Sequence, residues 1–262
     1  MVAAVASWLD ARAHGGQWLV RIEDLDPPRE VAGAAEDILR TLEGFGLTWD
    51  GPVVRQSDRH ALYREVLSRL QTSNLAFGCA CTRKVLAKVD GLVRYPGTCR
   101  EGVPPGVQPR SWRFRMPSGA ALNWKDRRQG HQVFDRDEAG DFTLLRADAH
   151  WAYHLAVVTD DEAQGVTDVV RGADLVSATA CHLALQQALR MNEPRYMHVG
   201  LVVNDQGQKL SKQTLAVPVE LRDAPSVLQE VMTHLKLGAM ERAPLEDMLQ
   251  EGVARWRKTY LK

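Results

Sequence analysis

The sequence has few cysteines, no long apolar run and no excess of charge of either sign. Four cysteines in 262 residues are too few for a disulfide scaffold, and three of them crowd between Cys79 and Cys99. No apolar stretch approaches the roughly 18 residues of a membrane span. No lysine or arginine precedes the apolar start from Met1 to Leu9, unlike a secretory signal. We therefore expect a cytoplasmic protein with no membrane partner.

The charges balance. The 33 lysines and arginines equal the 33 aspartates and glutamates, so the whole-molecule charge gives no sign of polyanion binding, and any RNA contact must come from a local basic face. The chain is 45% hydrophobic and 25% charged, which is typical of a folded protein and argues against disorder. Its length allows one catalytic domain and a smaller satellite. Neither G-x-x-x-x-G-K-[ST] nor G-x-G-x-x-G occurs, which argues against P-loop and dinucleotide-binding enzymes.

The order of apolar segments predicts an α/β fold with a doubly wound sheet. Apolar spacing predicts helices at 2–13, 32–44, 58–71, 177–189, 226–237 and 245–256, and strands at 18–22 and 166–171. A near-continuous apolar run at 152–158 predicts a further strand, of the kind that is buried on both faces in parallel sheets.

The composition also predicts a division into parts. Residues 1–77 and 131–203 alternate helix and strand and would form two halves of one α/β domain. Between them, residues 78–130 are rich in cysteine, glycine, proline and arginine and would form an insertion with its own stabilising device. Residues 204–262 would hold a lysine-bearing loop followed by a helical stem.

The loop from Asn204 to Gln213 places Lys209 and Lys212 three residues apart with a hydroxyl, Ser211, between them. A lysine ammonium on a flexible stem suits the neutralisation of a phosphate whose charge shifts during a reaction. Most such pairs of lysines, however, belong to a solvated surface. The position of the loop after the α/β portion favours the phosphate-binding interpretation.

Cys79, Cys81, Tyr95 and Cys99 form the pattern C-x-C-x13-Y-x3-C. Three thiolates at this spacing can gather on one ion with an oxygen as fourth ligand, and three sulfurs favour zinc over magnesium or calcium. Buried free cysteines are the competing interpretation, and the residues alone favour neither. Cys181 lies in the apolar helix 177–189 and is most simply a core residue.

Three polar side chains are candidates for a substrate pocket. Glu23 follows a predicted strand directly, where open α/β sheets bind ligands, and a carboxylate there can receive an ammonium group; a solvated acidic turn is the alternative. Tyr153 and Arg171 belong to the next predicted strands and suit a carboxylate ligand. The alternative is that Tyr153 is core and Arg171 pairs with Asp168 or Asp174.

The lysine loop KLSKQ (209–213) resembles the KMSKS signature of class I aminoacyl-tRNA synthetases. Segments 19–30 (LVRIEDLDPPRE), 152–161 (AYHLAVVTDD) and 165–175 (GVTDVVRGADL) resemble the glutamyl branch of that family, in family order across most of the chain. The most similar members are the short ones that attach glutamate to queuosine in the anticodon loop of tRNA(Asp). Those members share the C-x-C…Y-x-x-x-C insertion and have no room for an anticodon-binding domain.

This resemblance implies a Rossmann-like class I catalytic domain, a small zinc-bearing insertion and a C-terminal helical stem. It implies that Glu23 binds the amino group of glutamate, that Tyr153 and Arg171 also bind glutamate, and that Lys212, assisted by Lys209, binds ATP and stabilises its phosphates together with magnesium. It further implies one structural zinc ion on the four residues of the cysteine pattern. The partners would be glutamate, ATP and tRNA(Asp) bearing queuosine, and we expect a monomer.

The family also begins with a strand carrying R-F-A-P-S-P-T-G and then H-x-G-S, ahead of the helix that starts here at Val2. We expect that segment, the first strand of the sheet, in frame upstream of Met1. Two other hypotheses stay open: a fragment of an ordinary glutamyl-tRNA synthetase that charges tRNA(Glu), and a non-catalytic RNA-binding relative.

Overall fold

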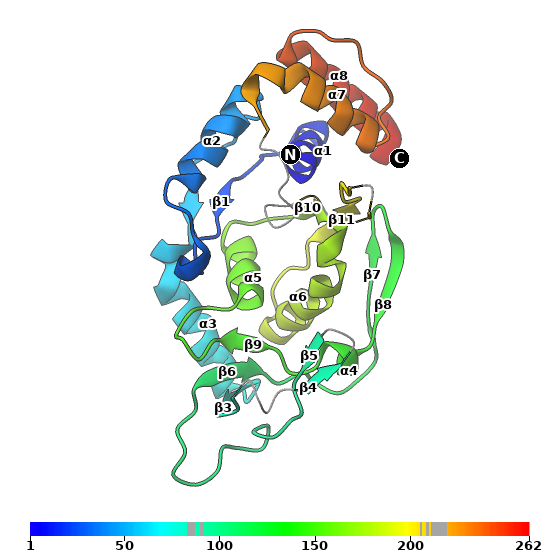
Figure 1. Cartoon of the computed structure of the whole chain (residues 1–262). Helices are drawn as coiled ribbons and strands as arrows, with labels where there is room; N and C mark the ends of the chain where they lie inside the picture. The colour runs from blue at the N-terminus through cyan, green and yellow to red at the C-terminus, as the bar shows by residue number, and fades with distance from the viewer. Residues whose placement is uncertain (83–86, 90–91, 205, 208–209, 211–218, 262) are drawn as a thin grey trace.

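Helices and strands alternate over residues 2–79 and 136–199, and several strands follow one another between these two parts (Figure 1). The computed structural model describes residues 1–82, 87–89, 92–204, 206–207, 210 and 219–261, and only the backbone of 87–89 and 92–94. The helices are α1 (Val2–Ala13), α2 (Ala34–Gly44), α3 (His60–Thr72), α4 (Arg136–Ala139), α5 (Tyr153–Ala163), α6 (Val176–Leu189), α7 (Ala224–His234) and α8 (Leu245–Tyr260). The strands are β1 (Arg21–Ile22), β2 (Val54–Arg55), β3 (Ala76–Cys79), β4 (Ala87–Val89), β5 (Leu92–Arg94), β6 (Ser111–Phe114), β7 (Leu122–Asp126), β8 (Gly130–Phe134), β9 (Thr143–Leu145), β10 (Asp168–Gly172) and β11 (Arg195–Val199).

The strands form two parallel pairs and three antiparallel groups. Strand β1 pairs with β2, and β10 pairs with β11, both in parallel. In the second pair Arg171 lies opposite His198 in the register. Strands β3, β6 and β9 form an antiparallel sheet, and β4–β5 and β7–β8 form antiparallel pairs. The fold is therefore mixed α/β, as predicted.

The apolar run at 152–158 is a helix and not the predicted strand. Residues 155–161 of α5 are all buried, so the helix has no polar stripe that would reveal a period of 3.6 residues. A helix that is buried on every side and a strand that is buried on both faces give the same apolar run, and periodicity cannot separate them. The predicted helices at 2–13 and 177–189 correspond to α1 and α6.

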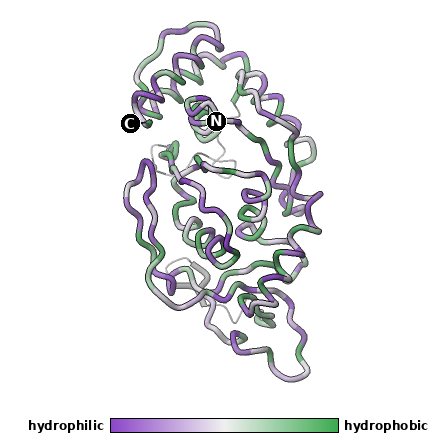
Figure 2. Tube along the Cα trace, turned by 180° about the vertical axis from the view of Figure 1, so that it is seen from behind, coloured by the Kyte–Doolittle hydropathy of each residue, from purple (hydrophilic) through white to green (hydrophobic). Residues whose placement is uncertain are grey.

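The two ends of the chain lie at the same end of the molecule (Figures 1 and 2), where α1 contacts α8. Trp256 of α8 is fully buried in the core that α1, α7 and α8 share. Its ring nitrogen donates a hydrogen bond of 2.8 Å to Asp10 of α1, and Asp10 also accepts two from Arg127. Asp10 therefore connects the C-terminal helix to α1 and to the turn of the β7–β8 hairpin. Within the part of the chain described, no helix combines the length and the apolar character needed to span a bilayer.

Candidate functional site

A cavity of about 590 Å³ opens between β1 and β10, and Glu23, Tyr153 and Arg171 all line it. Glu23 follows β1, Tyr153 begins α5, and Arg171 lies near the end of β10. The structure thus brings three distant segments to one cavity. Tyr153 reaches it from the first turn of a helix and not from a strand.

Arg171 is 8% exposed, and each of its N–H groups meets an uncharged acceptor. Nε donates to Nε2 of His198 at 3.1 Å. Nη1 lies 3.2 Å from the hydroxyl of Tyr153 and 3.3 Å from Nδ1 of His182. Nη2 donates to the hydroxyl of Thr179 at 2.8 Å and to the carbonyl of Leu175 at 3.2 Å. We call Arg171, Tyr153, Thr179, His182 and His198 the Arg171 cluster.

The alternative partner Asp168 is engaged elsewhere. Its carboxylate pairs with Arg127 at 3.2 Å and with Arg195 at 2.9 Å. His182, in contrast, is buried beside Arg171, and burial together with the guanidinium charge lowers the pKa of His182 well below its usual value. A neutral His182 adds no charge, so Arg171 supplies the positive charge of its cluster at neutral pH. A buried cation among neutral acceptors is the arrangement that an anionic ligand completes.

Glu23 stands on the opposite wall with its side chain 42% exposed. Arg21 lies 3.5 Å from it and binds Asp161 more closely, at 2.9 Å. Burial raises the pKa of Glu23, Arg21 opposes this shift, and the charges of Asp161 and Asp160 add to it. A carboxylate held so loosely is free to receive an ammonium group.

A second cavity, of about 540 Å³, shares Glu23 and Tyr153 with the first. Trp151, Phe142 and Arg146 line its other side. A molecule held between Glu23 and Tyr153 would therefore border both cavities.

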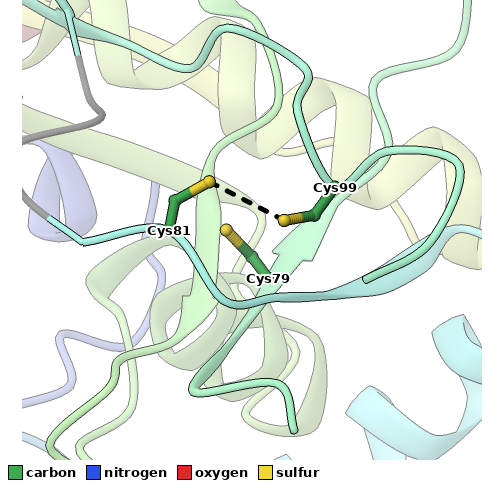
Figure 3. Close-up of side chains that lie close together, drawn as sticks. All are labelled: Cys79, Cys81 and Cys99. Carbon is green, nitrogen blue, oxygen red and sulfur yellow. Dashed lines mark hydrogen bonds between the residues drawn. The ribbon is translucent and has the colours of Figure 1, made fainter. Parts of the chain in front are cut away.

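Cys79, Cys81 and Cys99 point their sulfur atoms toward one another (Figure 3), and the three atoms lie within 4.8 Å of one another. The hydroxyl of Tyr95 lies 3.6 Å from the sulfur of Cys79 and 3.9 Å from that of Cys81, and it accepts a hydrogen bond of 2.7 Å from the backbone N–H of Cys99. We call these four residues the cysteine cluster. Three soft donors and one oxygen converging on one point is a donor set that suits a zinc ion.

Within the cysteine cluster a thiolate is favoured at Cys79, whereas burial and hydrogen bonding with Cys99 raise the pKa of the Cys81 thiol. Burial raises the pKa of the Cys79 thiol, but hydrogen bonds from Tyr95, the backbone of Cys81 and Arg113 outweigh it and lower that pKa to about 7. The guanidinium of Arg113 lies 4.2 Å from the centre of the Tyr95 ring. Cys181 lies apart in α6, where burial raises the pKa of its thiol to about 12, in keeping with a core residue.

Lys209 and Lys212 lie outside the described residues, so the predicted phosphate-binding lysines have no structural description. Sequence reasoning missed His198, His182 and Thr179. A histidine inside the apolar strand segment Tyr196–Val199 was the available signal, because a buried imidazole needs a polar partner.

The chain matches a known family over nearly all its length. Residues 2–251 match the family described as "tRNA synthetases class I (E and Q), catalytic domain". The chain is 51% identical to a Glutamyl-Q tRNA(Asp) synthetase of Chromobacterium violaceum, over 97% of this chain and 87% of that protein. Proteins with the same description from Neisseria meningitidis serogroup B and Leptothrix cholodnii are each 48% identical, over 98% and 100% of this chain and 90% and 92% of theirs.

The fold resembles that of solved structures of longer enzymes. A glutamate tRNA ligase from Elizabethkingia meningosepticum, crystallised in complex with its amino acid, superposes with a TM-score of 0.80 at 24% identity. The match covers 95% of this chain, which spans 60% of that structure's length. At this identity the likeness shows the fold alone.

Proposed function

The chain belongs to the class I tRNA synthetases for glutamate and glutamine, and from that premise we propose that it activates glutamate with ATP and transfers it to queuosine in the anticodon loop of tRNA(Asp). The observation that carries the proposal is the identity of about half the residues to Glutamyl-Q tRNA(Asp) synthetases over almost the whole chain. The cavity supports it, because an acidic side chain, Glu23, and a cationic one, Arg171, both line it, and glutamate carries both complementary charges.

In the proposed complex Glu23 receives the ammonium group of glutamate, and Arg171 and Tyr153 bind its carboxylate. The positive charge of Arg171 and the hydroxyl donor of Tyr153 suit a carboxylate, whereas the uncharged amide of glutamine would leave the charge of Arg171 unsatisfied. Selection of glutamate over glutamine would thus depend on the Arg171 cluster.

The proposed reaction needs no protein nucleophile. The α-carboxylate of glutamate attacks the α-phosphate of ATP and gives glutamyl-adenylate and pyrophosphate, and a hydroxyl of the queuosine ring then takes the glutamyl group. The protein's contribution is alignment of the two substrates and neutralisation of phosphate charge. We assign the neutralisation to Lys212 with Lys209 and to the magnesium that accompanies ATP.

We propose that the cysteine cluster holds one structural zinc ion. Its four donors would complete a tetrahedral set and leave no open position for water or substrate, so the ion would stabilise the insertion (78–130) and take no part in the reaction. The division at residues 77, 130 and 203, the monomeric state and the cytoplasmic location stay predictions.

The test is transfer of radioactive glutamate to purified tRNAs. We expect incorporation into tRNA(Asp) that carries queuosine, in the presence of ATP, and none into tRNA(Asp) that carries guanosine in its place. Labelling of tRNA(Glu) instead would favour an ordinary glutamyl-tRNA synthetase fragment. Absence of labelling of every tRNA, with no glutamate-dependent exchange of pyrophosphate into ATP, would contradict the proposal.

A further inference from the structure

His198 and Asp126 form a pair of buried polar side chains on the side of Arg171 that faces away from the cavity. Nδ1 of His198 lies 2.6 Å from Oδ2 of Asp126, and neither side chain is exposed. Asp126 ends β7 and His198 belongs to β11, so the pair joins the hairpin to the parallel strands.

The contacts of His198 fix its tautomer. An arginine Nε can only donate, so Nε2 of His198, which receives the hydrogen bond of Arg171, carries the lone pair. The ring proton of His198 is therefore on Nδ1 and is donated to Asp126. The other carboxylate oxygen of Asp126 accepts three backbone N–H groups, from Arg128 at 3.0 Å, Gln129 at 2.8 Å and His198 at 3.2 Å.

We propose that Asp126 and His198 are positioning residues that hold the Arg171 guanidinium in the orientation in which it binds glutamate. The inference rests on the proposed role of Arg171 in substrate binding. Asp126 acts at a distance: it holds the proton of His198 on Nδ1, and the free lone pair on Nε2 then fixes Nε of Arg171. The same buried carboxylate supplies negative charge behind the cation through a neutral ring.

The variant Asp126→Asn would reverse this arrangement without a change of size. The amide oxygen would stay with the three backbone N–H groups, which leaves the amide N–H₂ facing Nδ1 of His198. The proton of His198 would then move to Nε2 and meet the N–H of Arg171, donor against donor. Burial makes a lost acceptor costly, so we expect the dissociation constant for glutamate to rise by about tenfold to 100-fold, with ATP affinity unchanged.

A matched control is Asp141→Asn. Asp141 is also buried and also accepts a backbone N–H, that of Met116; its other partner is the guanidinium of Arg100, and both partners lie outside the Arg171 cluster. We expect this variant to lose stability with glutamate affinity within about threefold of the unmodified protein, as for a site with no shared partners.

The experiment combines ¹⁵N NMR of histidine and arginine side chains with calorimetric titration of glutamate on the purified chain. The expected result is an Nδ1–H tautomer of His198 in the unmodified protein and Nε2–H in Asp126→Asn, with weakened glutamate binding only in that variant. An unchanged tautomer, or a changed tautomer with unchanged glutamate affinity, would overturn the inference. If the unmodified protein binds no glutamate, the proposed function fails instead, and the exchange protection of the Arg171 Nε–H in the two proteins still decides whether Asp126 fixes Arg171.

A second pair of variants covers the case in which Asp126→Asn does not fold. His198→Gln keeps an oxygen that can accept from Arg171, whereas His198→Leu keeps none. Glutamate affinity should be restored by at least about fivefold in the glutamine variant relative to the leucine variant. Equal losses in both would contradict the positioning role.

Discussion

The Arg171 cluster and the cysteine cluster are both mostly buried groups of polar side chains, but they suit ligands of opposite charge. Among the residues that the structure describes, the donors of the Arg171 cation meet uncharged acceptors. The cysteine cluster gathers sulfur and oxygen donors around one point, with Cys79 close to ionisation at neutral pH. The first arrangement calls for an anion and the second for a cation. Each cluster is thus complementary to a different ligand, and variants should separate the two.

The largest effect is expected from Cys99→Ser, with Cys181→Ser as the control. Loss of one thiolate should release the zinc ion and lower the free energy of unfolding by at least about 4 kcal/mol, because binding of a structural metal contributes directly to folding. Metal analysis and thermal unfolding check this. The control thiol lies in α6 away from the cluster, so Cys181→Ser should keep one zinc per chain. Equal metal content in Cys99→Ser and the unmodified protein would contradict the proposal that the cysteine cluster binds a zinc ion.

Among the changes to the cavity, Arg171→Lys should weaken glutamate binding most. A lysine ammonium cannot reproduce the fork of donors, and we expect the dissociation constant for glutamate to rise more than about 100-fold, or about 3 kcal/mol. Zinc content should not change. Arg195→Lys is the matched control, since Arg195 lies on the neighbouring β11 and is exposed. Calorimetry that found similar glutamate affinity in both variants would refute the role of Arg171.

Glu23→Gln tests the role of the Glu23 carboxylate, which has a long contact of 3.5 Å with Arg21. Loss of one charged hydrogen bond should weaken glutamate binding by about 2 kcal/mol, or roughly 30-fold. Because the pKa of Glu23 is raised, protonation should weaken glutamate binding as the pH falls, at a higher pH than for an ordinary glutamate side chain. Glutamate titrations across acidic pH should show this step in the unmodified protein and in the control Glu36→Gln, and not in Glu23→Gln. A step that persists in Glu23→Gln belongs to another group.

Tyr153→Phe should have the smallest effect. It removes one neutral acceptor of Arg171 and one donor for the substrate, worth about 1 kcal/mol or roughly fivefold in glutamate affinity. Tyr260→Phe, whose hydroxyl bonds the backbone of Leu235, is the control and should leave glutamate affinity unchanged. A loss as large as that of Arg171→Lys would contradict this ranking, because the tyrosine would then contribute as much to glutamate binding as the arginine.

The cysteine cluster could be predicted from the sequence because its members lie within 21 consecutive positions, from Cys79 to Cys99. Their residue types also name the ligand chemistry. The Arg171 cluster could be predicted only in part. Its supporting residues come from separate elements: Thr179 and His182 belong to α6, and His198 belongs to β11. Only the register of β10 on β11 places His198 beside Arg171.

The strand predicted at 152–158 was wrong because contacts between distant parts of the chain decide the burial of this segment. Residues 155–161 of α5 are buried, so the polar residues among them, Thr159, Asp160 and Asp161, do not mark the exposed face on which a sequence-based prediction of a helix depends. Asp160 tolerates burial because Arg59, Tyr63 and Gln56 all bond to its carboxylate. Such partners are remote in the sequence, so only the folded chain reveals why a charged residue lies inside.

The most direct test of the account is the amino-acid dependence of pyrophosphate exchange into ATP, measured with and without tRNA(Asp). We predict that glutamate supports exchange with a kcat/KM at least about 100-fold above that of glutamine, and that Arg171→Gln, which removes the positive charge, removes this preference. Equal exchange with both amino acids, or a preference that survives Arg171→Gln, would contradict the claim that the buried positive charge of Arg171 selects the substrate.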